Sequence, residues 1–418
     1  MSEATAYVIG GGVAGLSAAV SLGREGRRVE VIEGAAQAGG RCRSYHDPQL
    51  DMVIDNGNHL VLSGNWAVRD YLAEIGASDR LAGPETAAIA FADLRSGEHW
   101  TIRPNDGPIG WWILDPRRRV PGTRAGGYLP LLKLLYPRSG RRIDQVMACD
   151  GLVWERLIEP FLLAVLNTAP AEGAADLAAA VIRETLAKGG QACRPRIATP
   201  TLAAAFVDPA TAWIEGHGGA VRCGRRVRAL RFDGPRLAAL VLPEGEVTLQ
   251  PADSVVLAVP PWAAQELVPG LQVPDEFRAI VNGHFRFTPP PGTAPMVGLI
   301  GGTAEWVFAF EDRLSVTVSG ADRLLDEDRE GLARTLWADV AKLHGLPDAL
   351  PPWQIVKERR ATFAATPEQN VKRPGARTAW DNLFLAGDWT DTGLPATIEG
   401  ALRSGRLAAH LALARKVV

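Results

Sequence analysis

Three glycines near the start of the chain have the spacing that brings a backbone up to phosphate oxygens. Residues 7–19 read as a strand, a turn that contains Gly10, Gly12 and Gly15, and a helix. Gly10 permits the tight turn, Gly12 lets the backbone approach the phosphates, and Gly15 lets the helix pack close to the strand. The helix N-terminus then presents free N–H groups and a positive dipole to the anion. The spacing therefore predicts a bound dinucleotide pyrophosphate.

An acidic residue ends the next strand. Glu33 closes residues 29–33 and follows Gly10 by 23 positions. That spacing suits a carboxylate that binds the ribose hydroxyls of a dinucleotide. Because a strand, a helix and an acid accompany the glycines, dinucleotide binding is favoured over a glycine-rich turn in some other α/β protein. The glycines do not indicate which dinucleotide binds.

Composition excludes several other classes of protein. Hydrophobic residues make up 47% and charged residues 22% of the 418 positions, as in folded proteins of two or three domains. The net charge of −2 gives no overall reason to expect a nucleic-acid partner. Four cysteines are widely spaced and form no CxxC or Cys/His cluster, so no metal site is predicted. They read as reduced thiols of a cytosolic protein: Cys42, Cys149, Cys193 and Cys223.

Hydropathy along the chain predicts no membrane-spanning helix. No uninterrupted apolar run reaches the roughly 20 residues that a span requires. Residues 1–6 are too short and too polar for a signal peptide. We therefore expect a cytoplasmic protein, either soluble or peripheral at the inner face of a membrane.

Strand patterns alternate along the chain with stretches of helical periodicity. Strands are expected at residues 53–62, 218–230 and 252–260, at several places within 280–320, and at 382–389. Helices are expected at residues 66–76, 143–167, 174–188, 324–344 and 396–413. Beyond a few short strands near residue 90, the middle of the chain lacks strand alternation, so we expect it to be mostly helical.

These elements predict an α/β fold whose Rossmann-type domain is assembled from discontinuous segments. Residues 1–90, 200–265 and 365–418 would form the nucleotide-binding domain. Residues 91–199 and 266–364 would form an inserted α+β substrate domain, helical in its first part and sheet-containing in its second.

Four further segments narrow the dinucleotide. They are Gly39-Gly40-Arg41 after Glu33, residues 55–57, the expected strand that carries Val227, and the pair formed by residues 385–388 and 399–401. In this order they resemble the amine oxidase and carotenoid desaturase superfamily of flavoproteins. The resemblance implies FAD as the cofactor.

The resemblance also implies roles for individual residues. Arg41 would approach the pyrophosphate, and Asp388 would accept hydrogen bonds from the ribityl chain or a bound water. The turn and helix after Asp388 would place N–H groups near the flavin N1–O2 edge, where they stabilise negative charge on the reduced ring. The full set of cofactor contacts expected is Gly10, Gly12, Val13, Ala14, Gly15, Glu33, Gly40, Arg41, Gly57, Asn58, His59, Val227, Gly387, Asp388, Thr397, Ile398 and Ala401.

Within this superfamily, residues 55–62, 155–168 and 387–401 are similar to the hydroxysqualene dehydroxylases, and the last block is the most specific. Membership would imply reduction of hydroxysqualene to squalene with loss of water, in squalene and hopanoid biosynthesis. A polyisoprenoid desaturase, with FAD accepting the hydride, is the alternative, because sequence does not set the direction of electron flow. An amine oxidase is less favoured, since Thr397 stands where those enzymes commonly carry an aromatic residue. A non-catalytic flavin- or prenyl-binding protein is the alternative outside enzymes.

The reaction implied needs a proton donor for the leaving hydroxyl. His59 follows the Asp55–Gly57 turn, which in the superfamily passes beside the flavin ring, and its ordinary pKa suits proton donation. Its alternative role is a hydrogen bond to the flavin or to nearby backbone. Asp391, beside the Gly387-Asp388 pair, is a second candidate acid, with a surface loop position as its alternative.

A basic aromatic segment suggests a partner surface. Trp111 and Trp112 precede Arg117, Arg118 and Arg119, a combination that suits an anionic bilayer interface. Core tryptophans beside a solvated arginine run are the alternative. The long apolar substrate implied above would reside in a membrane, which favours peripheral contact. No second dinucleotide fingerprint identifies an electron donor.

Overall fold

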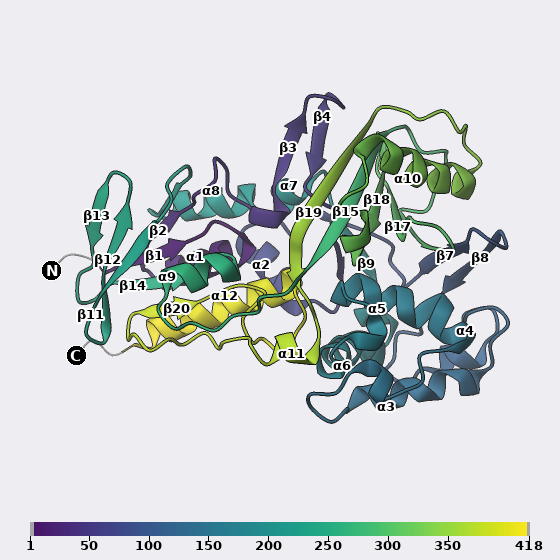
Figure 1. Cartoon of the computed structure of the whole chain (residues 1–418), viewed down its shortest axis with the longest axis horizontal. Helices are drawn as coiled ribbons and strands as arrows, with labels where there is room; N and C mark the ends of the chain where they lie inside the picture. Colours follow the sequence, from purple (N-terminus) through teal and green to yellow (C-terminus); the bar gives the residue numbers. More distant parts are fainter. Residues whose placement is uncertain (1–3, 416–418) are drawn as a thin grey trace.

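A parallel five-stranded sheet is assembled from the start, middle and end of the chain. The computed structural model describes residues 4–415 (Figure 1), so the outermost three residues of the predicted segments 1–90 and 365–418 lie outside the described residues. The sheet has the order β10-β2-β1-β14-β20, and each neighbouring pair is parallel. Its strands are β1 (Thr5–Ile9), β2 (Arg28–Ile32), β10 (Ala220–Arg222), β14 (Ser254–Leu257) and β20 (Leu383–Leu385). β14 and β20 are buried at every position, as in a sheet covered on both faces, whereas the edge strand β10 is partly exposed. The predicted Rossmann-type α/β fold is confirmed.

Helix α1 (Val13–Arg24) lies directly against helix α12 (Ile398–Leu413), as Figure 1 shows. A Cβ added to Gly405 would lie 2.2 Å from the Ala14 carbonyl oxygen, so only glycine permits this approach. The Ser17 hydroxyl donates to the Leu402 carbonyl oxygen at 3.0 Å. The last helix of the chain therefore holds the helix of the glycine-rich turn in place. The remaining helices around this sheet are α2 (Trp66–Glu74), α7 (Leu202–Phe206), α8 (Asp208–Gly216), α9 (Pro261–Leu267) and α11 (Pro367–Asn370).

A second sheet of seven strands has the order β19-β15-β18-β17-β16-β7-β8. Its strands are β7 (Ile89–Asp93), β8 (Glu98–Ile102), β15 (Phe277–Arg286), β16 (Met296–Ile300), β17 (Trp306–Ala309), β18 (Arg313–Val318) and β19 (Trp353–Phe363). One face packs on α10 (Arg329–His344), whose first turn is capped by the Asp328 carboxylate accepting from the Gly331 N–H at 2.8 Å. The strands predicted within residues 280–320 are confirmed.

The predicted helical block differs from the structure in two ways. Its first strands, β7 and β8, join the second sheet through β16. The predicted helix 143–167 starts only at Gly151, whose φ of +82° breaks the helical path, and it includes a π-helical stretch, Trp154–Ile158. It ends at Asn167, which is left-handed at φ 48°. The helices of this block are α3 (Leu132–Leu135), α4 (Gly151–Val153), α5 (Glu159–Leu166) and α6 (Ala175–Glu184).

Three small sheets complete the fold. A hairpin, a three-stranded antiparallel sheet near β20, and a three-stranded sheet between the two main parts are present. Their strands are β3 (Ser44–Asp47) with β4 (Met52–Asp55), β11 (Ala229–Asp233) with β12 (Arg236–Leu242) and β13 (Gly245–Thr248), and β5 (Leu60–Leu62) with β9 (Pro195–Ala198) and β6 (Leu81–Ala82). Among the helices of residues 4–415, none combines the length and hydropathy needed to span a bilayer.

The close approach of α1 and α12 gives a test of the fold. In the variant Gly405→Ala the new methyl group meets backbone atoms, so one helix must shift. We expect a loss of about 1–3 kcal/mol in unfolding free energy and weaker flavin retention, measured by thermal unfolding and by flavin absorbance. Gly216→Ala is the matched control, because its Cβ meets nothing within 4 Å. Equal stability of the two variants would contradict this account of the helix contact.

Candidate functional site

The glycine-rich turn has two glycines required by packing and one that leaves space. Gly10 has a φ of +106°, and a Cβ there would lie 2.4 Å from the Ala258 carbonyl oxygen. A Cβ on Gly15 would lie 1.9 Å from the Gly10 oxygen. A Cβ on Gly12, in contrast, would meet nothing within 4 Å. The open side of Gly12 is where the fingerprint predicts the phosphates.

The N-terminus of α1 fits an anion. Gly12 is the N-cap, so no side chain caps the first turn, and that turn contains no acidic residue. The N–H groups of Val13 and Ala14 lie in this first turn, and unpaired N–H groups at a helix start favour an anion. The residues present therefore fit a pyrophosphate group.

The Glu33 carboxylate is fixed by two backbone N–H groups. Its Oε2 accepts from the Gly11 N–H, and its Oε1 accepts from the Ala35 N–H, each at 2.7 Å. A carboxylate oxygen accepts more than one hydrogen bond, so both oxygens keep capacity for ribose hydroxyls. Glu33 thus lies beside the glycine-rich turn, as its spacing predicts.

The second glycine pair brings a cation to the same turn. Gly39 and Gly40 both have positive φ angles, and a Cβ on Gly40 would lie 3.4 Å from the Gly12 Cα. Arg41 follows, and its Nη2 donates to the Asp388 Oδ1 at 2.7 Å. The same guanidinium also donates to the Ala361 carbonyl oxygen of β19. The Asp388 carboxylate raises the pKa of Arg41 despite burial, so the guanidinium stays charged.

The Gly387-Asp388 turn is tightly packed. Gly387 has a φ of +152°, and a Cβ there would lie 2.4 Å from the Trp389 Nε1. Its N–H donates to the Ser404 hydroxyl of α12 at 2.9 Å, and the Trp389 indole donates to the Val259 carbonyl oxygen at 3.0 Å. These bonds fix the direction in which Asp388 leaves the end of β20.

Arg373 is a structural residue of this turn that the sequence analysis did not identify. Its guanidinium donates to the carbonyl oxygens of Asp388 at 3.3 Å, Trp389 at 3.4 Å and Thr390 at 2.5 Å. Burial lowers the pKa of Arg373 to about 10, which leaves it charged at neutral pH. It also donates to the Asn370 Oδ1 at 3.1 Å and to the Thr392 hydroxyl at 3.3 Å. No motif marks it, because most of its partners are backbone oxygens.

The turn that carries His59 is supported by the second sheet. A Cβ on Gly57 would lie 2.8 Å from the Asn282 Nδ2, which explains the glycine. Asn58 donates from Nδ2 to the Thr317 Oγ1 at 3.1 Å, and Thr317 donates to the Asn282 Oδ1 at 2.8 Å. Asn282 on β15 and Thr317 on β18 were also missed, since nothing in the local sequence links them to Gly57.

His59 lies within the electrostatic reach of the Arg41–Asp388 pair. Burial and the Arg41 charge lower the pKa of His59 to about 4, against a smaller opposite effect of Asp388. The imidazole is therefore neutral at neutral pH, and its ring N–H remains available as a donor. Asp391 is exposed, and its Oδ1 accepts from the Gly393 N–H at 3.3 Å. That position matches a surface loop acid.

The start of α12 uses its polar side chains for capping. The Thr397 hydroxyl accepts from the Gly400 N–H at 3.0 Å, while Ile398 and Ala401 lie in the first turn. Glu399 accepts from the Ala67 and Val68 N–H groups at 3.1 and 3.0 Å, so it caps α2. The helix start is thus rigid.

Val227 was predicted to lie in a strand, but in the structure it lies between β10 and β11. It is buried in the extended segment just before β11, and the neighbouring Arg228 N–H donates to the Val241 carbonyl oxygen at 2.8 Å. The predicted strand breaks here at a turn with Gly224, whose φ is +74°.

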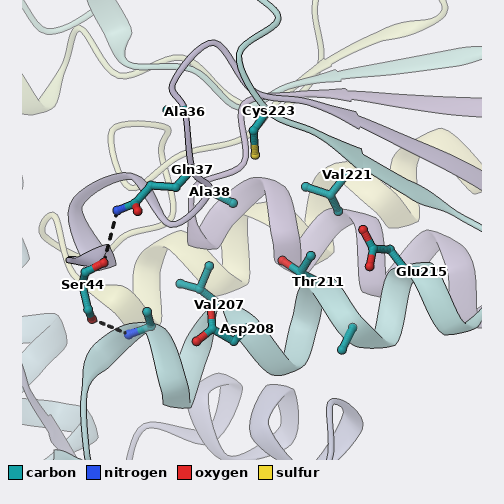
Figure 2. A pocket seen from close by; sticks show the side chains of 12 residues that line it. Ala36, Gln37, Ala38, Ser44, Val207, Asp208, Thr211, Glu215, Val221 and Cys223 are labelled. Atoms are coloured by element: carbon teal, nitrogen blue, oxygen red, sulfur yellow. Dashed lines mark hydrogen bonds between the residues drawn. The ribbon is translucent and has the colours of Figure 1, made fainter. Parts of the chain in front are cut away.

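A groove of about 460 Å³ opens beside the loop that follows Glu33 (Figure 2). It is lined by that loop, by α7 and α8, and by the end of β10, with Gln37, Glu215 and Cys223 among its side chains. Of the site residues predicted from sequence, none in the described part of the chain lines this groove. The groove is therefore separate from the arrangement around Arg41 and His59.

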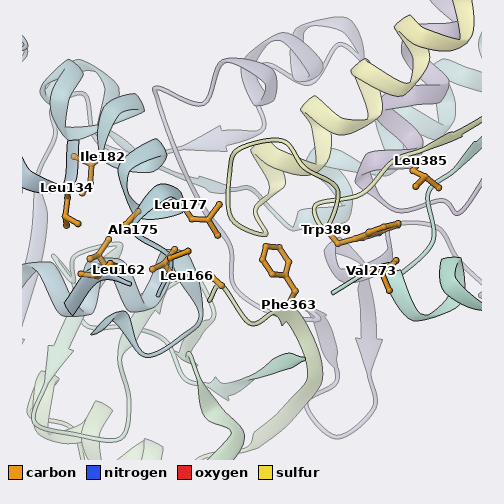
Figure 3. Close-up of a cluster of buried hydrophobic side chains, with 14 of the residues drawn as sticks. Leu134, Leu162, Leu166, Ala175, Leu177, Ile182, Val273, Phe363, Leu385 and Trp389 are labelled. Carbon is orange, nitrogen blue, oxygen red and sulfur yellow. The ribbon is translucent and has the colours of Figure 1, made fainter. Parts of the chain in front are cut away.

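An apolar cluster extends from the helical block to the Gly387-Asp388 turn. Figure 3 shows its side chains from α3 and α6 through α5 to Phe363 and Trp389. Members along this line are Leu134, Ile182, Leu162, Leu166, Leu177, Phe363, Trp389 and Leu385. The Gly387-Asp388 turn thus borders a packed apolar core that reaches from the helical block to the parallel sheet.

Fold and site together define an FAD-dependent oxidoreductase built on a Rossmann-type sheet. The family model described as flavin containing amine oxidoreductase matches residues 13–413. Hydroxysqualene dehydroxylases of Rhodopseudomonas palustris and Zymomonas mobilis are 53% and 48% identical to this chain, over 98% and 97% of it and 98% of their own length. The chain therefore belongs to the flavin-containing amine oxidoreductases and, within them, to the hydroxysqualene dehydroxylase family.

More distant relatives share the fold. A 15-cis-phytoene desaturase of Glycine max is 23% identical over 96% of this chain and 78% of its own. The structure of cyclohexylamine oxidase from Brevibacterium oxydans superposes with a TM-score of 0.71 at 14% identity, covering 98% of this chain and 99% of that one. Putrescine oxidase bound to putrescine gives 0.70 at 16% identity, covering 99% of each chain. These two structures support the fold.

The Arg373 contacts give a test of the site. Arg373→Leu leaves buried carbonyl oxygens without donors, so we expect a loss of at least about 2 kcal/mol in stability and partial loss of FAD. Thermal unfolding and the ratio of flavin to protein absorbance measure both. Arg231→Leu, an exposed arginine on β11, should change stability by no more than about 0.5 kcal/mol. If Arg373→Leu kept full FAD occupancy and unchanged stability, Arg373 would not support the Gly387-Asp388 turn.

Proposed function

We propose that this protein reduces hydroxysqualene to squalene with loss of water, in squalene and hopanoid biosynthesis. The observation that carries the proposal is identity of 48–53% to three hydroxysqualene dehydroxylases over nearly the whole chain. Similarity to phytoene desaturases is much weaker, which makes the desaturase reading the second candidate.

We infer that residues 1–90, 200–265 and 365–418 form the part that holds FAD, because the five parallel strands come from these segments. The Gly12 turn and the N-terminus of α1 would bind the pyrophosphate, and Glu33 would bind the adenosine ribose. Arg41 and Asp388 would lie between the phosphates and the ribityl chain. Residues 91–199 and 266–364 would enclose the substrate.

When bound, reduced FAD supplies the hydride that replaces the hydroxyl at the allylic carbon. The hydroxyl leaves as water and therefore takes up one proton, which balances the proton released when reduced FAD is oxidised. We propose that neutral His59 orients this hydroxyl by donating a hydrogen bond. The apolar side chains around Phe363 and Trp389 would exclude bulk water from the reacting carbon.

We also propose peripheral membrane contact for a cytoplasmic protein. A C30 hydrocarbon alcohol partitions into a bilayer, so an enzyme without a spanning helix in residues 4–415 must meet it at the surface. Apolar side chains beside basic residues in the helical block support this proposal.

The reaction itself is tested by single-turnover chemistry. Holoenzyme reduced without oxygen and mixed with detergent-dispersed hydroxysqualene should form squalene while the flavin absorbance returns, in a one-to-one ratio. Mass spectrometry of the product and flavin absorbance measure the two halves. Flavin reduction by a saturated polyisoprenoid segment, with no squalene from hydroxysqualene, would favour the desaturase instead.

The role of His59 is tested by two substitutions. His59→Ala should keep FAD and lower kcat at least about tenfold, because the hydrogen bond to the hydroxyl is lost. His59→Gln keeps an N–H donor, so its kcat should stay within about threefold of wild type. Because the His59 pKa is about 4, kcat should show no ionisation of this group between about pH 5 and pH 8. Equal losses in both variants, with a titration near neutrality only in wild type, would indicate an acid role.

A further inference from the structure

Positive charge is concentrated in one part of the chain. Residues 103–142 contain nine arginines and lysines and two acidic residues, which leaves 36 basic and 45 acidic residues elsewhere. This segment therefore carries a net charge of +7 in a chain whose total is −2. Such segregation creates a local field that attracts an anionic partner.

The same segment exposes an unusual number of large apolar side chains. Single exposed apolar residues are normal, but a group in one segment marks an interaction site. Six of the large hydrophobic residues exposed in the described chain fall between positions 109 and 136. They are Ile109 at 78% exposure, Trp111 at 49%, Leu114 at 67%, Leu129 at 59%, Leu132 at 61% and Tyr136 at 83%.

These residues belong to elements that pack on one another. A 3-10 turn, Trp111–Leu114, contacts a second one, Ala125–Leu131, which continues directly into α3. The buried Trp112 ring meets the Tyr128 ring edge-on, with centroids 5.4 Å apart. We call the exposed side chains of Ile109, Trp111, Leu114, Leu129, Leu132 and Tyr136 the docking surface.

The segment around α3 is apolar on both faces. Tyr128 and Leu134 point inward and are buried, whereas Leu129, Leu132 and Tyr136 are exposed. Packing within the chain accounts for the inner face only. The exposed apolar side chains are in contact with water, which is unfavourable in free energy unless another apolar surface covers them.

The structure changes the roles of the residues singled out in the sequence. Trp112 belongs to the core, and Arg118 stacks on Trp111, with its Cζ 4.6 Å from the ring centroid. Arg118 also donates to the Arg103 carbonyl oxygen, and Arg119 to the Ile113 carbonyl oxygen at 2.7 Å. These arginines shape the surface. Arg117 is highly exposed and pairs with Asp115 at 3.2 Å.

We propose that the docking surface inserts its apolar side chains into an anionic lipid bilayer, with the surrounding basic residues over the lipid headgroups. The exposed apolar side chains suit the hydrocarbon interior of such a membrane, and the basic residues near them suit its anionic headgroups. A symmetric contact with a second copy is disfavoured, because it would place two surfaces of the same charge against each other.

The docking surface lies at the outer end of the apolar cluster. Leu132 faces outward on α3, while Leu134 of the same helix belongs to the cluster that continues to Trp389 (Figure 3). A hydrocarbon substrate that leaves the bilayer at this surface would therefore meet the molecule on the side where its apolar core begins. This link to catalysis rests on the proposed function, whereas lipid binding does not.

Vesicle sedimentation of the FAD-loaded protein tests the proposal. Wild type should bind vesicles of phosphatidylcholine mixed with phosphatidylglycerol, and bind pure phosphatidylcholine vesicles much more weakly. Ile109→Gln/Leu129→Gln/Leu132→Gln should weaken binding to mixed vesicles at least about tenfold. Arg124→Gln/Lys133→Gln/Arg138→Gln should weaken it by about fivefold for each charge removed, and added salt should act in the same direction.

Matched controls carry the same substitutions elsewhere. Val371→Gln/Leu407→Gln replaces exposed apolar residues outside the surface, and Arg69→Gln/Arg80→Gln/Arg334→Gln replaces exposed arginines. Both should bind vesicles like wild type. All variants should turn over detergent-dispersed hydroxysqualene at wild-type rates, so failure of the reaction is distinguished from failure of docking.

Three results would overturn the proposal. Wild type that binds neither vesicle type shows that no lipid covers the surface. If the control variants lost as much vesicle binding as the surface variants, lipid binding would depend on the overall charge of the protein and not on the docking surface. A dimer that dissociates in the Ile109/Leu129/Leu132 variant, without vesicle binding by wild type, would make the surface a subunit interface.

Discussion

The ion pair between Arg41 and Asp388 is the contact on which the site depends. It joins residues 347 positions apart, one after the second glycine pair and one at the end of β20. Because the Asp388 side chain is almost fully buried, loss of either partner would leave a charge poorly solvated. The pair also reaches β19 through the Ala361 carbonyl oxygen, so it connects the two main sheets.

The same pair sets the electrostatics of the only histidine among the predicted site residues. Arg41 lowers the pKa of His59 and Asp388 raises it, while burial is the largest effect. The neighbouring Cys42 thiol has its pKa raised to about 12 by burial, so it does not form a reactive thiolate at neutral pH.

Local backbone geometry explains what the sequence predicted well. Gly15 is required by its contact with the Gly10 carbonyl oxygen, and Gly10 by its positive φ and by its contact with Ala258 after β14. Both requirements fall on closely spaced glycines, which leaves a short, recognisable motif. Arg373, Asn282 and Thr317 act across long sequence separations on backbone atoms or amides. No periodicity or spacing reveals such partners. The predicted helix from residue 143 was wrong up to residue 150, because Gly151 at positive φ overrides apolar periodicity.

Thr397 links the shape of the site to its choice of substrate. Its hydroxyl caps α12 by accepting from the Gly400 N–H, a bond that requires a short polar side chain at this position. The family resemblance places an aromatic residue here in enzymes that bind amines. In this protein a helix-capping threonine stands in place of that aromatic residue. The apolar side chains around Phe363 and Trp389 lie beside the Gly387-Asp388 turn. We propose that a site without aromatic contacts for a cation, bordered by apolar side chains, disfavours a charged substrate. An uncharged hydrocarbon alcohol satisfies that condition, whereas an ammonium group would lose its hydration without gaining a partner.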